Sequence, residues 1–186
     1  MEPLASRIRP ESLVEYVGQE HLVGTGKPLR VAMEKKELFS FILWGPPGSG
    51  KTTLARIYAK AVGAEFFELS AVDSGKEDIR KIIMPGGMLL NKSPRILFID
   101  EIHRFNKAQQ DFLLPFVERG DLTLIGATTE NPSFEVTKAL LSRCRVFVLN
   151  ELNDKEIEEI IKRTKLKVQK DALEWLISMA HGDARQ

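Results

Sequence analysis

The most informative segment of the sequence is Phe41-Ile42-Leu43-Trp44 followed by Gly45-Pro46-Pro47-Gly48-Ser49-Gly50-Lys51-Thr52. The first four residues are typical of a buried strand, and the next eight match the P-loop pattern, a glycine-rich turn that opens a helix. Its amides surround a β-phosphate, its lysine reaches the β- and γ-phosphates, and its threonine binds Mg²⁺. An ordinary glycine-rich turn is the alternative. We predict a nucleotide-phosphate site at Gly45, Pro46, Pro47, Gly48, Ser49, Gly50, Lys51, Thr52 and Thr53.

A second motif follows farther along the chain, where the apolar run Ile96–Ile99 ends in Asp100 and Glu101. Two carboxylates buried without partners would be costly, so we expect them at a strand end beside the P-loop. There Asp100 can join the Mg²⁺ shell, and Glu101 can act as the general base that polarises a water toward the γ-phosphate. These two motifs alone also fit a nucleotide kinase.

Five short runs rich in branched and aromatic residues predict strands, and helical spacing separates them. Connections of this length favour a parallel sheet covered on both faces, which is an α/β fold. Asn106 with Gln109 and Asn153 with Glu156 match capping boxes and predict two helix starts. The predicted strands are Phe41–Trp44, Phe66–Leu69, Ile96–Ile99, Leu122–Gly126 and Val146–Leu149.

The composition changes near Asn150, where strand signals stop and helical ones begin. We predict a nucleotide-binding α/β domain over residues 1–150 and part of a small helical lid over residues 151–186. In the first lid helix, acidic residues come early and basic residues late, which complements the helix dipole. The spacing also predicts the pairs Glu158–Lys162 and Glu159–Arg163.

Composition and charge limit which partners, metal sites and compartments the sequence allows. The 186 residues carry a net charge of +1, with 27 basic and 26 acidic side chains, so any DNA contact must be local. The single cysteine, Cys144, excludes an internal disulfide and a cysteine-based zinc site, and it suits a reducing compartment. The longest apolar run is too short to cross a membrane, and the start lacks the layout of a secretory signal, so we expect a cytoplasmic protein without a membrane partner.

Several further motifs occur together with these two, and the combination is more specific than any one of them. They are Gly126-Ala127-Thr128-Thr129, Ser142-Arg143-Cys144, Gly182-Asp183-Ala184-Arg185, Leu4–Pro10, Gly18–Leu22, His103–Lys107 and Thr128–Phe134. Together with the P-loop and the acidic strand end, these motifs resemble those of AAA+ ATPases of the clamp-loader branch. More narrowly, they resemble the replication-associated recombination ATPases, whose eukaryotic members are the Werner-helicase-interacting ATPases.

The resemblance implies roles for three more residues. Thr129 matches sensor 1, which contacts the γ-phosphate or the attacking water, although Thr128 is an alternative. Arg143 matches the arginine finger that reaches the nucleotide of a neighbouring subunit, and a surface salt bridge is its alternative. Arg185 matches sensor 2, a lid arginine that contacts phosphates within its own subunit, and the alternative is an idle arginine near the chain end.

The resemblance also places the adenine against the N-terminal segment, at Arg9, Pro10, Val17, Gly18 and Gln19. Apolar walls with few polar anchors suit a purine, and simple packing of an N-terminal arm is the alternative.

Smaller expectations concern single side chains. Ser70, at the end of the second strand, is a candidate tether for Glu101. His21 and His103 are expected to form hydrogen bonds rather than to bind a metal. The segment Met84–Met88 contains Pro-Gly-Gly and predicts a bend or loop.

The predicted whole is therefore a P-loop NTPase of the AAA+ type, with a five-stranded parallel sheet between helices and part of a helical lid. It is expected to bind ATP or ADP with Mg²⁺ and to hydrolyse ATP. The resemblance implies action on fork-like DNA or single-strand/duplex junctions in replication-fork maintenance, recombination and repair. Homo-oligomers and replication or single-strand-binding proteins are the implied partners, and the oligomerisation region is expected beyond this chain. The alternatives are a Holliday-junction branch-migration motor and a nucleotide-binding scaffold with little turnover.

Overall fold

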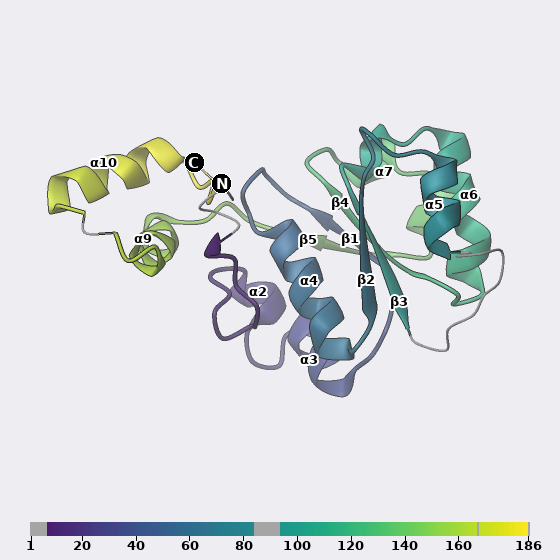
Figure 1. The fold of residues 1–186 in the computed structure, drawn as a ribbon, viewed down its shortest axis with the longest axis horizontal. Helices are drawn as coiled ribbons and strands as arrows, with labels where there is room; N and C mark the ends of the chain where they lie inside the picture. The colour runs from purple at the N-terminus through teal and green to yellow at the C-terminus, as the bar shows by residue number, and fades with distance from the viewer. Residues whose placement is uncertain (1–6, 84–93, 167, 186) are drawn as a thin grey trace.

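The computed structural model describes residues 7–83, 94–166 and 168–185, and its centre is a parallel sheet with helices on both faces (Figure 1). All the strand pairs are parallel, and the order across the sheet is β2-β3-β4-β1-β5. The strands are β1 (Phe41–Trp44), β2 (Glu65–Ser70), β3 (Arg95–Asp100), β4 (Thr123–Thr128) and β5 (Arg145–Val148).

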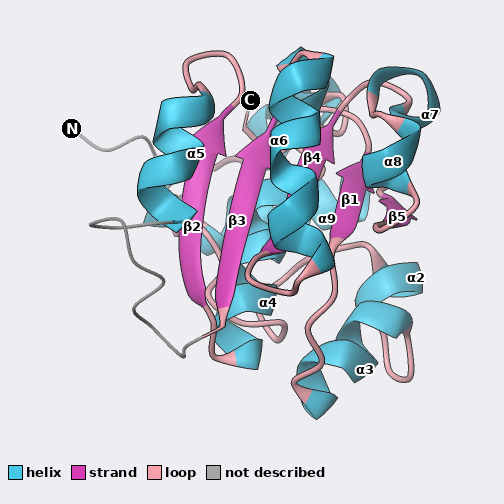
Figure 2. Cartoon of the chain, turned by 90° about the vertical axis from the view of Figure 1, so that its right-hand side faces the viewer, coloured by secondary structure: helices cyan, strands magenta, loops and turns pink. Residues whose placement is uncertain are grey.

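The helices divide between the two faces and a separate C-terminal pair. Helices α2, α3 and α4 cover one face, and α5 to α8 cover the other, as the turned view shows (Figure 2). Their bounds are α2 (Glu20–Val23), α3 (Pro28–Lys35), α4 (Lys51–Val62), α5 (Lys76–Ile83), the 3₁₀ turn η2 (Ile102–Arg104), α6 (Lys107–Glu118), α7 (Pro132–Glu135), α8 (Lys138–Leu141), α9 (Asp154–Arg163) and α10 (Lys170–Ala180).

Successive side chains along a strand point to opposite faces of the sheet, so each strand contributes to the apolar core on both faces. In β3, Ile96 and Phe98 pack toward α4, and Leu97 and Ile99 pack toward α5 and α6. All four side chains are fully buried. The continuous apolar runs in the sequence thus reflect a sheet that is buried on both sides, which is the usual state of a parallel sheet.

The C-terminal pair α9 and α10 lies beside the sheet rather than on it (Figure 1). A small apolar cluster around Leu152, Ile157 and Ala180 holds the pair together. Asn153 caps α9 through a capping box with Glu156, as predicted. Both predicted ion pairs form, Lys162 with Glu158 at 2.6 Å and Arg163 with Glu159 at 2.7 Å.

The predicted strands are all present, but some of their ends are wrong. β4 begins one residue later than expected and continues two residues farther, so that Thr128 lies inside the strand. β5 is shifted one residue toward the N-terminus. Pairing with β1 explains the later end of β4 and the shift of β5, because Thr128 in β4 is opposite Trp44, and Arg145 and Val148 in β5 are opposite the two ends of β1. The segment Met84–Met88 lies outside the described residues.

Both histidines lie within hydrogen-bond distance of an oxygen atom, as expected, and the cysteine packs against the core. His21 Nε2 lies 2.8 Å from the Val148 carbonyl oxygen, and His103 Nδ1 lies 3.0 Å from Thr128 Oγ1. Cys144 packs against the core, and burial raises the pKa of its thiol to about 12. In the described part of the chain, no cluster of three metal-ligating side chains forms and no helix is long and apolar enough to cross a membrane.

Gln110 is a buried polar side chain that joins α6 to the α7–α8 segment. Its amide nitrogen donates to the carbonyl oxygens of Phe105 (2.9 Å) and Glu135 (3.0 Å), and its oxygen accepts from the Thr137 backbone nitrogen (2.8 Å). Only 2% of the residue is exposed. These three bonds fix the segment that leads to Arg143.

We expect Gln110→Ala to lower the free energy of unfolding by about 2 kcal/mol, because it leaves buried backbone groups without partners. In a chain of this size that corresponds to a fall in melting temperature of roughly 4–8 °C. Denaturant unfolding with Gln169→Ala as the exposed control measures the difference. Equal stability of the two variants would contradict this role for Gln110.

Candidate nucleotide-binding site

The P-loop joins the end of β1 to the start of α4 in the predicted arrangement. Gly48 and Gly50 have φ angles of 68° and 91°, a region that residues with a Cβ rarely adopt. Ser49 Oγ donates to the Pro46 carbonyl oxygen at 2.8 Å and closes the turn. The loop therefore presents backbone amides at the start of a helix, which favours an anion.

A cavity of about 330 Å³ opens over this loop, between the N-terminal segment, the carboxyl edge of the sheet and the C-terminal helices. Most of the predicted site residues line it: Arg9, Pro10, Val17, Pro47, Gly48, Ser49, Gly50, Lys51, Thr52, Thr53, Asp100, Glu101, Thr129 and Arg185. Thr128 and residues to which the sequence analysis gave no nucleotide-binding role complete the wall, the latter being Ile8, Tyr16, Leu152, Ile160, Arg163 and Ala184.

Lys51 is half-buried and is held by the loop itself. Its Nζ donates to the carbonyl oxygens of Gly45 and Pro46, both at 2.7 Å. Burial lowers the pKa of Lys51 to about 8, while Asp100 opposes that shift. Gly45 and Pro46 thus contact the lysine rather than the cavity.

The two acidic residues lie where β3 ends. Asp100 is the last residue of the strand, and its Oδ1 accepts a hydrogen bond from the Glu101 backbone nitrogen at 3.1 Å. Glu101 has a left-handed conformation with φ 52°, which strains a residue that carries a Cβ and is typical of functional positions. The strand end therefore turns the Glu101 side chain toward the cavity that it lines.

Ser70 lies beside Asp100 in the sheet register but does not tether Glu101 here. Its hydroxyl accepts from the Val72 backbone nitrogen at 3.3 Å. Within the described residues, the charged partner of Glu101 is Arg104, at 3.9 Å.

The two threonines after β4 have different surroundings. Thr128 is 1% exposed, and its hydroxyl contacts His103 and donates to the Glu130 carbonyl oxygen at 3.1 Å. Both threonines line the cavity, but Thr129 is exposed. Because the Thr128 hydroxyl is already bonded within the chain, Thr129 is favoured over Thr128 as the threonine that contacts the nucleotide or the attacking water.

Part of the N-terminal segment lines the cavity, and part of it packs behind the lining residues. Gly18 and Gln19 lie behind the wall: a Cβ at Gly18 would come within 2.7 Å of Leu152. The Gln19 side chain is buried and bridges two segments, donating to the carbonyl oxygen of Asn150 at 2.8 Å and, more weakly, to that of Ser49 at 3.4 Å. Of these two predicted adenine residues, Gln19 thus connects the P-loop to the exit of β5.

Tyr16 is the most informative residue that the sequence analysis missed. Its hydroxyl donates to the Gly50 carbonyl oxygen at 3.4 Å, and its ring lies so close that a Cβ at Gly50 would be 2.7 Å from that hydroxyl. Burial raises the pKa of the phenol, with a smaller contribution from Glu156. The only available signal was its position directly before Val17.

The two predicted arginines lie in different places. Arg185 lines the cavity and is paired with Asp183, whose Oδ2 lies 3.0 Å from Arg185 Nη2. Arg143 lies outside this cavity, where it forms an ion pair with Glu118 and donates to the Ala139 carbonyl oxygen at 2.7 Å.

Comparison with known proteins identifies the family of the chain. Residues 41–152 match the model of the ATPase family associated with various cellular activities (AAA). The chain is 53% identical to replication-associated recombination protein A of Escherichia coli K12, over 86% of this chain and 36% of the relative, and 47% identical to ATPase WRNIP1 of Dictyostelium discoideum, over 98% of this chain and 22% of the relative.

A solved structure is also similar. The Holliday junction branch migration motor RuvB of Thermotoga maritima is 33% identical, with a TM-score of 0.77 over 96% of this chain and 62% of that chain. The present chain spans less than half the length of the curated relatives it matches. The family match covers the P-loop, the acidic strand end and the exit of β5, and the chain belongs to the AAA family of ATPases.

Proposed function

We propose that the chain binds ATP in this cavity and hydrolyses it, and that it does so in the service of DNA replication-fork maintenance, recombination and repair. One observation carries the proposal: Lys51 from the start of α4 and the adjacent Asp100 and Glu101 from the end of β3 line the same cavity over the P-loop. A phosphate cradle, a metal-binding carboxylate and a candidate base in one place are what ATP hydrolysis requires.

The nucleotide would lie with its phosphates on the amides of residues 48–53 and its base against the N-terminal segment. Arg9, Pro10 and Val17 line that end of the cavity together with Ile8 and Tyr16, which supports an apolar purine site. Lys51 would exchange its two carbonyl partners for phosphate oxygens. The lysine charge is then compensated by phosphate rather than by neutral backbone.

Glu101 would accept a proton from the attacking water, and Thr129 would orient that water or the γ-phosphate. A hydroxyl and a carboxylate are oxygen donors of the kind that Mg²⁺ takes, so Thr52 and Asp100 would hold this ion. When bound, Mg²⁺ would neutralise charge on the β- and γ-phosphates.

The two arginines would act in different ways. Arg185 reaches the cavity of its own chain, which supports a contact with the phosphates in cis. Arg143 lies on the surface outside this cavity, which supports a role in the site of a second copy, and therefore a homo-oligomer. In that arrangement residues 1–150 form the nucleotide-binding domain, and residues 151–186 form part of the lid.

The role on DNA rests on similarity. Relatives about 50% identical are named for replication-associated recombination, whereas the branch migration motor is less similar in sequence, so we favour fork-like DNA or single-strand/duplex junctions as the substrate. Replication or single-strand-binding proteins are the corresponding protein partners. A scaffold with little turnover is the alternative from another class.

The DNA role predicts that ATP turnover rises severalfold with forked DNA and less with blunt duplex of the same length. Steady-state phosphate release measures both. Turnover unchanged by every DNA structure, with no DNA binding, would contradict the DNA role while leaving the ATPase assignment intact.

The roles of Lys51 and Glu101 predict that substitutions at the two positions separate binding from hydrolysis. Lys51→Ala should weaken ATP binding at least roughly tenfold, because a charge-assisted hydrogen bond is lost. Glu101→Gln should keep binding and lower turnover roughly 10²- to 10⁴-fold. Calorimetric titration and phosphate release measure these effects, with Lys60→Ala, on the exposed side of α4, as the control. Parent-like turnover by Glu101→Gln would rule out the base assignment.

The role of Arg143 predicts complementation between two inactive chains. Arg143→Ala should leave nucleotide affinity nearly unchanged and depress hydrolysis, since a finger typically contributes about 10³ to 10⁵ in rate. Mixing Arg143→Ala with Glu101→Gln should restore part of the activity, because some sites then have both groups. Arg119→Ala is the control for losing a surface guanidinium. Failure to complement in a verified oligomer would indicate a purely structural arginine.

A further inference from the structure

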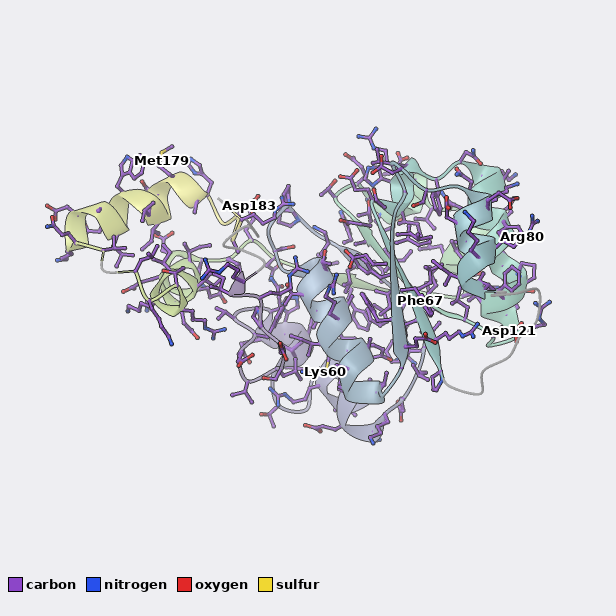
Figure 3. All side chains as sticks on the ribbon, in the orientation of Figure 1. Lys60, Phe67, Arg80, Asp121, Met179 and Asp183 are labelled. Atoms are coloured by element: carbon purple, nitrogen blue, oxygen red, sulfur yellow. The ribbon has the colours of Figure 1, made fainter. Side chains whose placement is uncertain are left out.

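The segment after α10 lies against the P-loop. The Ala184 backbone nitrogen approaches the Gly48 carbonyl oxygen at 3.4 Å. The Asp183 carboxylate occupies the space that a side chain at Gly48 would need, and a Cβ there would also be 2.6 Å from Asp183 Cα. Asp183 lies at the junction between the C-terminal helices and the loop before α4 (Figure 3). A carboxylate is thus packed onto the loop that is expected to bind phosphate.

The same carboxylate is bound by Arg185. Its Oδ1 accepts from the Arg185 backbone nitrogen at 2.8 Å and from Nε at 3.1 Å, and its Oδ2 accepts from Nη2 at 3.0 Å. These hydrogen bonds lower the pKa of Asp183, so it is charged at neutral pH. The side chain is 17% exposed, whereas that of Arg185 is 63% exposed. Asp183 is therefore the fixed partner in the pair.

A carboxylate with two oxygens on one guanidinium occupies it as a phosphate would. Arg185 cannot keep all these contacts to Asp183 and also bind a phosphate with the same nitrogens. In addition, the charge of Asp183 would repel phosphates on the adjacent loop. Both effects oppose the binding of nucleotides whose β-phosphate lies on this loop, which ATP and ADP have and AMP lacks.

We propose that Asp183 is an internal competitor of the nucleotide phosphates, which holds Arg185 in the absence of nucleotide and sets how strongly affinity depends on phosphate-chain length. This inference rests on the proposed function, because it requires ATP in the cavity. Asp183 touches Arg185 and the P-loop, so it is a specificity-determining residue and not a catalytic one.

The test compares the binding of ATP, ADP and AMP to the 186-residue chain and to Asp183→Asn, in a Glu101→Gln background that prevents turnover. We expect Asp183→Asn to tighten ATP and ADP binding roughly fivefold, which is what a partly exposed charge pair contributes, and to leave AMP binding unchanged. Titration calorimetry measures the ADP and ATP constants, and competition against a fluorescent ADP measures AMP. Asp171→Asn, an exposed aspartate on α10, is the matched control.

Two further variants sharpen the test. Asp183→Ala removes the carboxylate through a different side chain, so the result does not depend on one variant folding. In an Arg185→Ala background the gain from Asp183→Asn should shrink, because no guanidinium remains to be released. A gain that is undiminished in that background would overturn the competition for Arg185.

Two other binding results would also overturn the proposed role of Asp183. An equal change for all three nucleotides would mean that Asp183 acts through lid packing, and weaker ATP binding would mean that it positions Arg185 for phosphate; either result overturns the proposal. Loss of the proposed function has a different signature, namely a parent chain that binds none of the three nucleotides.

Discussion

Other segments approach the glycines of the P-loop more closely than a side chain there would allow, and the site depends on this contact. The exit of β5 touches Gly45, with the Leu149 carbonyl oxygen 2.6 Å from where a Cβ would be. Asp183 occupies the corresponding space at Gly48, and Tyr16 that at Gly50. Three distant segments therefore close on one loop because it has no side chains at these positions. Glycine serves here both for backbone conformation and for close approach.

This convergence explains how a cavity forms at the carboxyl edge of a parallel sheet. Parallel strands bring their ends to one edge, and the sheet order places β1 between β4 and β5. Thr129 follows the first of these neighbours, and Leu152 the second. The side chain of Gln19 then connects the N-terminal segment to the P-loop and to Asn150, so the wall opposite the sheet is fixed by hydrogen bonds as well as by apolar contact.

Each cation assigned to phosphate has an internal partner in this structure. Lys51 donates to two carbonyl oxygens, Arg185 pairs with Asp183, and Arg143 pairs with Glu118. These partners lower the cost of holding positive charge near a half-buried site. They also mean that a phosphate must replace existing contacts, so the affinity for nucleotide is a difference between two sets of interactions.

Sequence alone determined the parallel α/β fold, the P-loop, the acidic end of β3 and the capped starts of α6 and α9. Each of these depends on neighbours in the chain: a run of apolar residues, a fixed spacing of glycines, or a side chain that bonds an amide three positions away. Only the tertiary structure decided the surroundings of the two threonines, because the end of β4 depends on its pairing with β1: Thr128 is buried within the strand, and Thr129 is exposed after it. Likewise, the places of Tyr16, Gln19 and Asp183 follow from contacts between segments more than 25 residues apart in sequence. Such contacts are set by how the sheet orders its strands, and no local pattern encodes them.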